Sequence, residues 1–332
     1  MQRLTEKEKT MHNISIRHLS LPLTFIALLS ASSAHASCGG AFCTINTSED
    51  ALGPWVKPGW RMDLRAEYVE QDTLRSGSAK IAPAGEPDTH DEVRTLNRNF
   101  LASLDYSWNA AWGVSAQVPW VSRFHEHIHN DPVDGPASEQ WRFEKFGDVR
   151  IVGRYQFMGL PDHAHAAGVQ FGLKLPTGST TVNNSDGERA ERTLQPGTGT
   201  TDLVLGTYYN TPRGRDKLSW FAQAMAVSPL NSHEDFRPGL HLTLSTGLNY
   251  VLNDSMNGLL QLNLSHKARD RGAQAEPDDS GSRQAFISPG LSIALNQHTR
   301  IYGFVQLPVY QSVNGAQLTA DRAFVIGGGQ VF

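Results

Sequence analysis

Three histidines at alternate positions make "FHEHIHND" the stretch of this chain with the clearest chemical potential. His125, His127 and His129 are two residues apart, so in a strand their side chains point to the same face. Two imidazoles at i and i+2 on one strand face can hold a single metal ion through their ring nitrogens. Zinc and copper are the ions that imidazole suits best. The segment is therefore a candidate zinc or copper site.

A fourth histidine, His90 in "DTHDE", precedes the strand that we expect to pair with this segment. Cross-strand pairing would bring it near the other three histidines, and Glu126 and Asp131 offer carboxylate oxygens as further ligands. The alternative is a polar loop on the cell surface, rich in His, Asp and Asn, that holds no ion and no cofactor.

The elements that position these residues are predicted from the alternation in "WRMDLRAEY". Apolar residues occupy every even position from Trp60 to Tyr68, and charged residues occupy the odd positions. Successive side chains of a strand point to opposite faces, so one face is apolar and the other is charged. Segments with this pattern recur along the chain. We predict twelve strands, at about 59–70, 93–107, 112–125, 146–157, 167–176, 200–211, 217–227, 239–251, 257–267, 284–295, 299–310 and 320–332.

The connections between these strands alternate in length. The long ones are 71–92, 126–145, 177–199, 228–238, 268–283 and 311–319, and the short ones are 108–111, 158–166, 212–216, 252–256 and 296–298. Short periplasmic turns and longer outer loops are typical of bacterial outer-membrane barrels. We therefore predict an all-β protein in which residues 59–332 form an antiparallel transmembrane β-barrel of about twelve strands, in contact with outer-membrane lipid.

Composition excludes two other classes. The chain carries 29 Lys+Arg and 33 Asp+Glu, a net charge of -4, whereas nucleic-acid binders show a basic footprint. A mean hydropathy of -0.37 and the lack of a mature apolar run of about 18 residues exclude a helical membrane bundle.

Charged side chains on the strands are expected to face the barrel interior, because Arg or Lys facing the bilayer midplane costs about 2–4 kcal/mol. They form either a polar pathway with a constriction or a network that plugs the barrel and fixes strand register. The predicted lumen residues are Arg61, Asp63, Arg65, Glu67, Asp105, Arg123, Asp148, Arg150, Arg154, Lys174 and Asp202.

The N-terminus is predicted to be a cleaved signal peptide, residues 1–36. Arg17 and His18 precede the apolar "LSLPLTFIALLSASS", and Ala34-His35-Ala36 fits an A-x-A cleavage site. Met11 is an alternative start to Met1, because the first ten residues lengthen the polar region. Residues 37–58 are expected to form a leader that folds into the lumen as a plug, stays in the periplasm to meet a partner, or is only a loose tether.

The two cysteines of the chain, Cys38 and Cys43 in "CGGAFC", lie in this leader. In an oxidising compartment they are expected to close a small disulfide loop. A thiolate metal site or a redox pair is the alternative, although there is no second Cys pair and the spacing is not C-x-x-C.

Aromatic residues near strand ends are expected to form the interfacial girdles of the barrel, as at Trp60, Tyr106, Trp108, Trp112, Trp120, Tyr209, Tyr250 and Tyr310. The C-terminal Phe332 is usual for barrels inserted by the barrel-assembly machinery, which we therefore expect to be a partner.

Three phrases resemble a known family of barrels: "GDVRIVGRYQF", "FGLKLPTGSTT" and "LQPGTGTTDLVLGTYY". They are similar to the outer-membrane family named for the meta-pathway of phenol degradation, whose members are described as transporters. The resemblance covers about residues 146–332. It implies an outer-membrane barrel that passes small, often aromatic or hydrophobic, molecules, and it supplies no particular solute.

An outer-membrane hydrolase is the enzyme alternative. The sequence has no G-x-S-x-G, and adjacent Ser232 and His233 would point apart in an extended segment. The sequence therefore favours a channel or transporter that is not an enzyme, with a metal-binding surface barrel as the second hypothesis.

Overall fold

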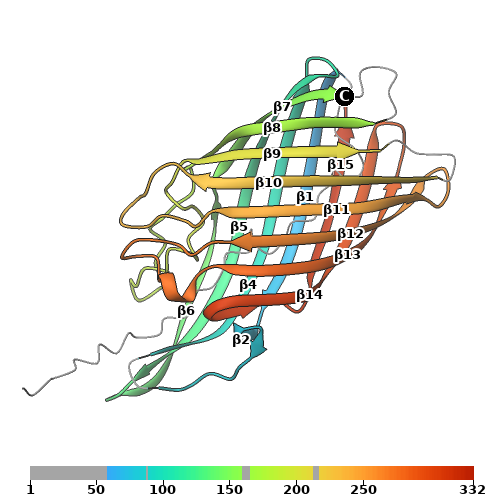
Figure 1. The fold of residues 1–332 in the computed structure, drawn as a ribbon. Helices are drawn as coiled ribbons and strands as arrows, with labels where there is room; N and C mark the ends of the chain where they lie inside the picture. Colours follow the sequence, from blue (N-terminus) through green and yellow to red (C-terminus); the bar gives the residue numbers. More distant parts are fainter. Residues whose placement is uncertain (1–57, 87–88, 159–164, 212–216) are drawn as a thin grey trace, which may run out of the picture. The chain divides into compact units, whose positions relative to one another are not determined.

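The structure is a computed structural model that describes residues 58–86, 89–158, 165–211 and 217–332, all within one compact unit, Ser33–Phe332. Twelve antiparallel strands of this unit close into a barrel, because β1 pairs with β4 on one side and with β15 on the other, and β13 pairs with β14. Figure 1 shows these strands wrapping around the barrel. The predicted fold class is confirmed.

The wall strands match the twelve predicted segments. They are β1 (Gly59–Gln71), β4 (His90–Ser107), β5 (Trp112–Asp131), β7 (Val149–Met158), β8 (Ala166–Leu175), β9 (Asp202–Asn210), β10 (Leu218–Pro229), β11 (His241–Val251), β12 (Met256–Lys267), β13 (Ser282–Ala294), β14 (Thr299–Thr319) and β15 (Ala323–Val331). In the described part of the chain, no helix has the length and apolar character needed to cross a membrane.

The two faces of each wall strand meet different surroundings. On β11, Leu242, Leu244, Leu248 and Tyr250 are 40–48% exposed, whereas Ser245 is buried on the inner face. Other wall strands likewise have buried polar residues on their inner face. These include Asn97, Asn99, Gln261, Asn263 and Ser265. An apolar exterior around a polar interior suits a wall that faces hydrocarbon.

Aromatic side chains mark both ends of the apolar exterior. At the short-turn end, Trp60 packs on Tyr106 with ring centroids 4.6 Å apart, and Tyr209 packs on Trp220 at 5.2 Å. At the long-loop end, Trp120 meets Phe146 at 4.7 Å. The part of β5 after Trp120 therefore extends beyond the membrane-facing belt.

The structure differs from the predicted loops at residues 126–145, 71–92 and 311–319, the last of which continue β14 to Thr319. Residues 126–145 form the end of β5 and a further strand, β6 (Gly135–Phe146), which pairs with β5 from Trp120 to Asp131. Residues 71–92 contain β2 (Thr73–Gly77) and β3 (Ala79–Lys80), and β2 pairs with the extended end of β14. Figure 1 shows the β5–β6 hairpin reaching past the barrel. Alternation in "QWRFEKF" explains β6, since Trp141 and Phe143 are buried between exposed neighbours.

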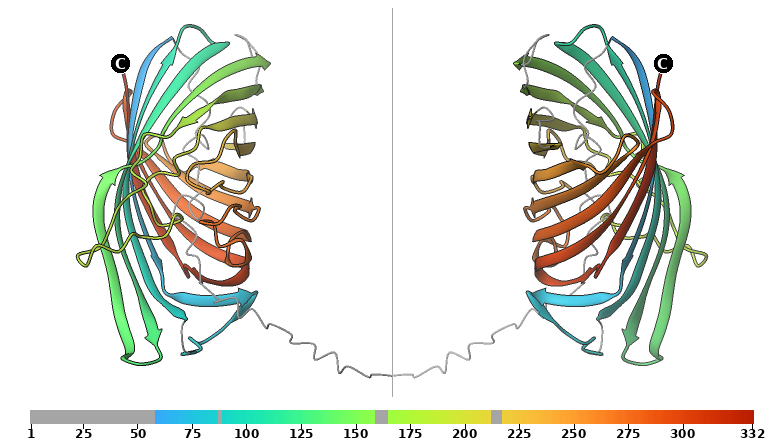
Figure 2. Two further views of the ribbon diagram at one scale, coloured as in Figure 1. Left: turned by 90° about the vertical axis from the view of Figure 1, so that its left-hand side faces the viewer. Right: turned by 90° about the vertical axis from the view of Figure 1, so that its right-hand side faces the viewer.

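The long-loop end carries an apolar cluster that joins distant segments. Trp141 of β6, Leu194 of loop 177–199, Leu74 of β2 and Leu318 of β14 are buried against one another. The left view of Figure 2 faces this end of the barrel. Loop 177–199 is therefore packed against the wall and the hairpins around it.

Several predictions fall on residues outside the described ranges. These are the signal peptide, the alternative start at Met11, the leader up to Lys57, and the Cys38–Cys43 disulfide. They stay predictions.

Candidate functional site

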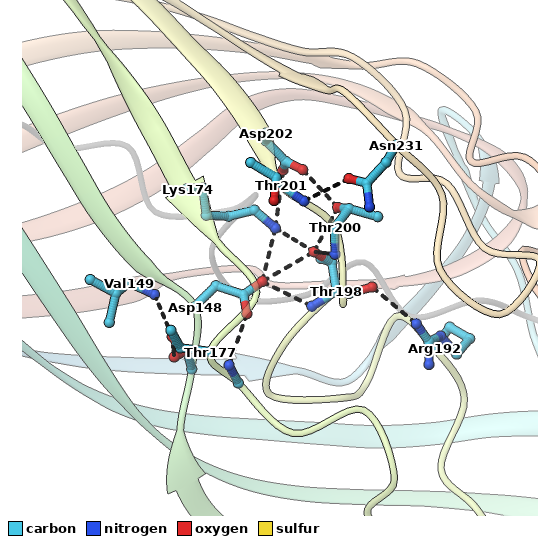
Figure 3. A network of polar contacts seen from close by, with 12 residues as sticks. Asp148, Val149, Lys174, Thr177, Arg192, Thr198, Thr200, Thr201, Asp202 and Asn231 are labelled. Atoms are coloured by element: carbon cyan, nitrogen blue, oxygen red, sulfur yellow. Dashed lines mark hydrogen bonds and ion pairs between the residues drawn. The ribbon is translucent and has the colours of Figure 1, made fainter.

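A network of charged side chains joins three wall strands to loop 177–199 (Figure 3). The Lys174 ammonium on β8 donates to Asp148, which directly precedes β7, at 2.8 Å and lies 3.0 Å from Asp202 on β9. Each of these side chains is at most 7% exposed. One cation shared between two carboxylates gives the network a net negative formal charge before the loop is added.

Both ends of loop 177–199 are attached to Asp148. Its carboxylate accepts hydrogen bonds from the backbone N–H of Gly178 at 3.0 Å and of Thr198 at 2.9 Å, and the Thr198 hydroxyl contacts Lys174. A Cβ on Gly178 would lie 2.7 Å from the Cα of Gly197, so the two ends of the loop cross at a glycine pair. Asp148 therefore pins the base of the loop to the wall.

Arg123 of β5, the wall strand that pairs with β7, holds the same loop nearer its C-terminal end. Its Nε donates to Asn97 at 2.6 Å, and its Nη1 donates to the carbonyl of Leu194. Within the loop, the Gln195 amide donates to the carbonyls of Val182 at 3.1 Å and Ala190 at 2.7 Å. These side chains donate to backbone carbonyls of the loop that are buried away from water. The loop therefore has a defined conformation within the barrel.

Loop and wall enclose a cavity of about 190 Å³. Six cationic side chains line it: Arg65, Arg123, Arg150, Lys174, Arg192 and Lys267. Three carboxylates line it: Glu67, Asp148 and Asp202. Glu234 and Asp270 pair with Arg192 and Lys267 from outside the lining. Six cations thus meet five carboxylates in and around the cavity, an excess of one positive charge, next to apolar side chains of Leu101, Val227 and Phe236.

Seven of the eleven predicted lumen residues line this cavity. The other four lie elsewhere in the interior: Arg61 pairs with Asp105 at 2.9 Å, Tyr302 donates to Asp63 at 2.9 Å, and Arg154 donates to Ser107 at 3.1 Å. The cavity residues from loop 177–199 were missed, because that loop was expected on the outer surface. The glycines and threonines of "LQPGTGTT" could have indicated that the chain turns tightly there and packs against the inner side of the wall before β9 begins.

The histidines form two groups on the β4–β5–β6 extension, beyond the membrane-facing belt. Glu92, His125 and His127 form a buried group, and His90, His129 and Glu139 form a partly exposed one. Within each group the ligand-type atoms lie within 4.8 Å of one another. All four predicted metal-binding histidines are thus close together, although His125 and His127 are buried rather than on a loop surface.

Burial sets the protonation of the inner histidines. The pKa of His125 lies well below its ordinary value, first because of burial and then because of His127 and Arg123 nearby. Burial also lowers the pKa of His127, partly opposed by the Glu139 carboxylate. Both imidazoles are therefore neutral at pH 7, the form that accepts a metal ion.

Comparison with known proteins finds the fold but no family. No protein-family model matches the chain, and no curated protein matches it. The COG4313 outer membrane channel from Pseudomonas putida F1 superposes with a TM-score of 0.63 at 10% identity, covering 87% of this chain and 100% of that one. The transport unit of the autotransporter AIDA-I from Escherichia coli superposes with a TM-score of 0.46 at 12% identity, covering 87% of this chain and 93% of that one. The KdgM porin superposes with a TM-score of 0.43 at 12% identity, covering 82% of this chain and 99% of that one.

At these identities the likeness shows the fold, that of an outer-membrane β-barrel. The resemblance to the phenol-degradation family is not confirmed. A closed barrel with an apolar, aromatic-edged exterior and a polar interior belongs in the bacterial outer membrane, with lipid around its wall.

Proposed function

We propose that this barrel is an outer-membrane channel for small anionic solutes, with its constriction between the wall and loop 177–199. The observation that supports it is the lining of the cavity, where six Lys or Arg side chains face three carboxylates. Rings of charged side chains of one sign select ions of the other sign in pores.

The chemistry of the lining favours a small organic acid over a neutral hydrocarbon. A carboxylate can approach Arg150, while its carbon part packs on Phe236 and Val227. The aromatic or hydrophobic solutes implied by the family resemblance fit this cavity only if they carry a negative charge, as an aromatic carboxylate does.

Ion selectivity tests the proposal. In planar bilayers with a KCl gradient, the reversal potential of the wild-type channel should show chloride passing more readily than potassium. A unit charge about 6 Å from an ion in water contributes about 0.7 kcal/mol, about threefold in ion occupancy. Arg150→Gln should therefore reduce the chloride preference by about that factor.

The matched control is Arg98→Gln, which removes the same charge from an exposed position on β4 and should leave the reversal potential unchanged. Uptake of benzoate into liposomes, compared with that of benzyl alcohol and benzylamine, extends the test to organic solutes. Cation preference in the wild type, or equal uptake of the three compounds, would refute anion selection.

A further inference from the structure

Conduction does not use the two histidine–glutamate groups, because they lie in the β4–β5–β6 extension and do not line the cavity. Their residues come from three strands, with Glu92 and His90 on β4, His125, His127 and His129 on β5, and Glu139 on β6. One extension of the barrel thus gathers four imidazoles and two carboxylates on its inner face.

A β-bulge in β4 creates this arrangement. From Thr95 onward, the residues of β4 that face the interior are the odd-numbered ones, such as Asn97 and Asn99. The register shifts at Val93, so that Glu92 instead of Val93 lies opposite His127, and His90 lies opposite His129. Directly paired residues share a face of the sheet, and bulges re-aim side chains next to functional sites. Without the bulge, both β4 ligands would point outward.

In each of the two buried imidazoles, His125 and His127, one ring nitrogen makes a hydrogen bond that orients the ring. Nδ1 of His125 bonds with the Thr95 hydroxyl at 2.9 Å, while its Nε2 has no hydrogen-bond partner in the described ranges and lies 3.7 Å from Glu92 Oε2. Nε2 of His127 bonds with Glu139 at 2.6 Å, and its Nδ1 has no such partner among the described residues. Metal-binding histidines characteristically use one ring nitrogen for the ion and the other for an oriented hydrogen bond.

Their burial makes these unpartnered nitrogens significant. His125 is 0% exposed and His127 is 4% exposed, and a buried polar atom without a partner costs about 1–3 kcal/mol. The indole of Trp141 covers both rings, with centroids 5.7 Å from His125 and 4.8 Å from His127. An ion bound between the rings and Glu92 would remove this cost.

The outer group lies directly beside the inner one. His90 and His129 are joined at 2.8 Å between Nε2 and Nδ1, and the His90 ring is 4.6 Å from that of His127. Glu139 belongs to the outer group while accepting from His127 of the inner one. The two groups therefore form a continuous series from partly exposed to fully buried ligands.

We propose that Glu92, His125 and His127 bind one transition-metal ion, Zn²⁺ or Cu²⁺, and that His90, His129 and Glu139 bind a second one nearer solvent. Two imidazole nitrogens and one carboxylate oxygen are a ligand set that both ions accept. Ligand atoms around zinc are separated by about 3.3 Å, given bonds of about 2.0–2.1 Å. The ligand-type atoms of each group already lie within 4.8 Å of one another, so binding would require side-chain rotations that bring them closer.

Calorimetric titration of the full chain with ZnCl₂ and with CuCl₂ tests the proposal. The protein is purified in detergent without a polyhistidine tag and with Cys38→Ser and Cys43→Ser, so that thiolates contribute nothing. The wild-type ligand set should take up two ions per chain. His125→Ala with His127→Ala, and separately His90→Ala with His129→Ala, should each remove one of the two.

The control is His298→Ala, which removes an exposed histidine from the turn between β13 and β14 and should leave both ions bound. Equal uptake by all variants, or no uptake by the chain with all its histidines, overturns the proposal. Retention of the folded band in unheated gel electrophoresis verifies that each variant is a barrel.

X-ray absorption at the zinc edge gives an answer even where a double variant does not fold. The parent chain loaded with one or two equivalents should show a shell of nitrogen and oxygen with the multiple scattering of imidazole. A shell of water oxygens alone overturns the proposal. Because this readout is independent of ion flux, its failure and that of the channel function are distinguishable.

Discussion

Replacing Asp148 by alanine is expected to release loop 177–199 and raise the single-channel conductance severalfold. The Asp148 carboxylate accepts hydrogen bonds from Gly178 at one end of the loop and Thr198 at the other, and it pairs with Lys174. Removing one partner of a buried ion pair costs about 3 kcal/mol. The loop can lower this cost by moving away from the wall, because Asp148 no longer holds its two ends. The narrowing that the loop imposes on the interior should then be lost. Planar-bilayer recording measures the change.

Asp105→Ala is the matched control for this variant. Asp105 is also a carboxylate of the barrel interior paired with a cation, Arg61, but it lies outside the cavity lining. It should leave the conductance close to that of the wild type. If Asp148→Ala and Asp105→Ala conduct alike while both fold, loop 177–199 does not set the constriction.

The second large effect is expected for Trp141→Ala. The indole fills the apolar cluster with Leu194, Leu74 and Leu318, and its Nε1 donates to the carbonyl of Glu188 at 3.0 Å. Truncating a buried Trp to Ala costs about 3–5 kcal/mol. The loss should be local, because the cluster lies at the long-loop end and the wall ladders are unaffected.

Limited proteolysis measures this local loss. Trypsin should cut Trp141→Ala rapidly at Arg189 or Arg192 of loop 177–199, while the barrel keeps its folded mobility in unheated gels. Trp108→Ala removes a tryptophan that is 55% exposed and should leave the cutting rate unchanged. Equal protection of both variants would mean that the apolar cluster does not hold the loop.

The strands were predictable because each wall residue faces one of two contrasting surroundings. Alternation of the kind in β1 depends only on local sequence, and it located all twelve strands to within a few residues except where β5 and β14 continue past the membrane. The inward direction of the charges followed from the cost of facing lipid, which also needs no tertiary knowledge.

The position of loop 177–199 was not predictable in this way. Its placement depends on Arg123 and Trp141, which are distant in sequence and belong to another wall strand and a hairpin. The histidines of β5 were found from their spacing, whereas Glu92 was missed because a single extra residue, Val93, changes which β4 side chains face inward. Bulges of this kind have no strong sequence signal.

Three features of the chain's maturation remain predictions: the cleaved signal peptide, the Cys38–Cys43 disulfide, and insertion by the barrel-assembly machinery. They concern residues outside the described ranges or a partner, and the barrel itself does not depend on them.

The central claim is that solutes pass through the charged interior beside loop 177–199, and thiol modification of a lining position tests it most directly. Gln117→Cys on β5 places a thiol in the cavity lining, and Val114→Cys places one on the opposite face of the same strand. In a background lacking Cys38 and Cys43, a thiol-reactive reagent that attaches a negatively charged sulfonatoethyl group should reduce the current of Gln117→Cys. It should leave the current of Val114→Cys unchanged. An unchanged current after complete modification of Gln117→Cys would contradict a pathway through the interior.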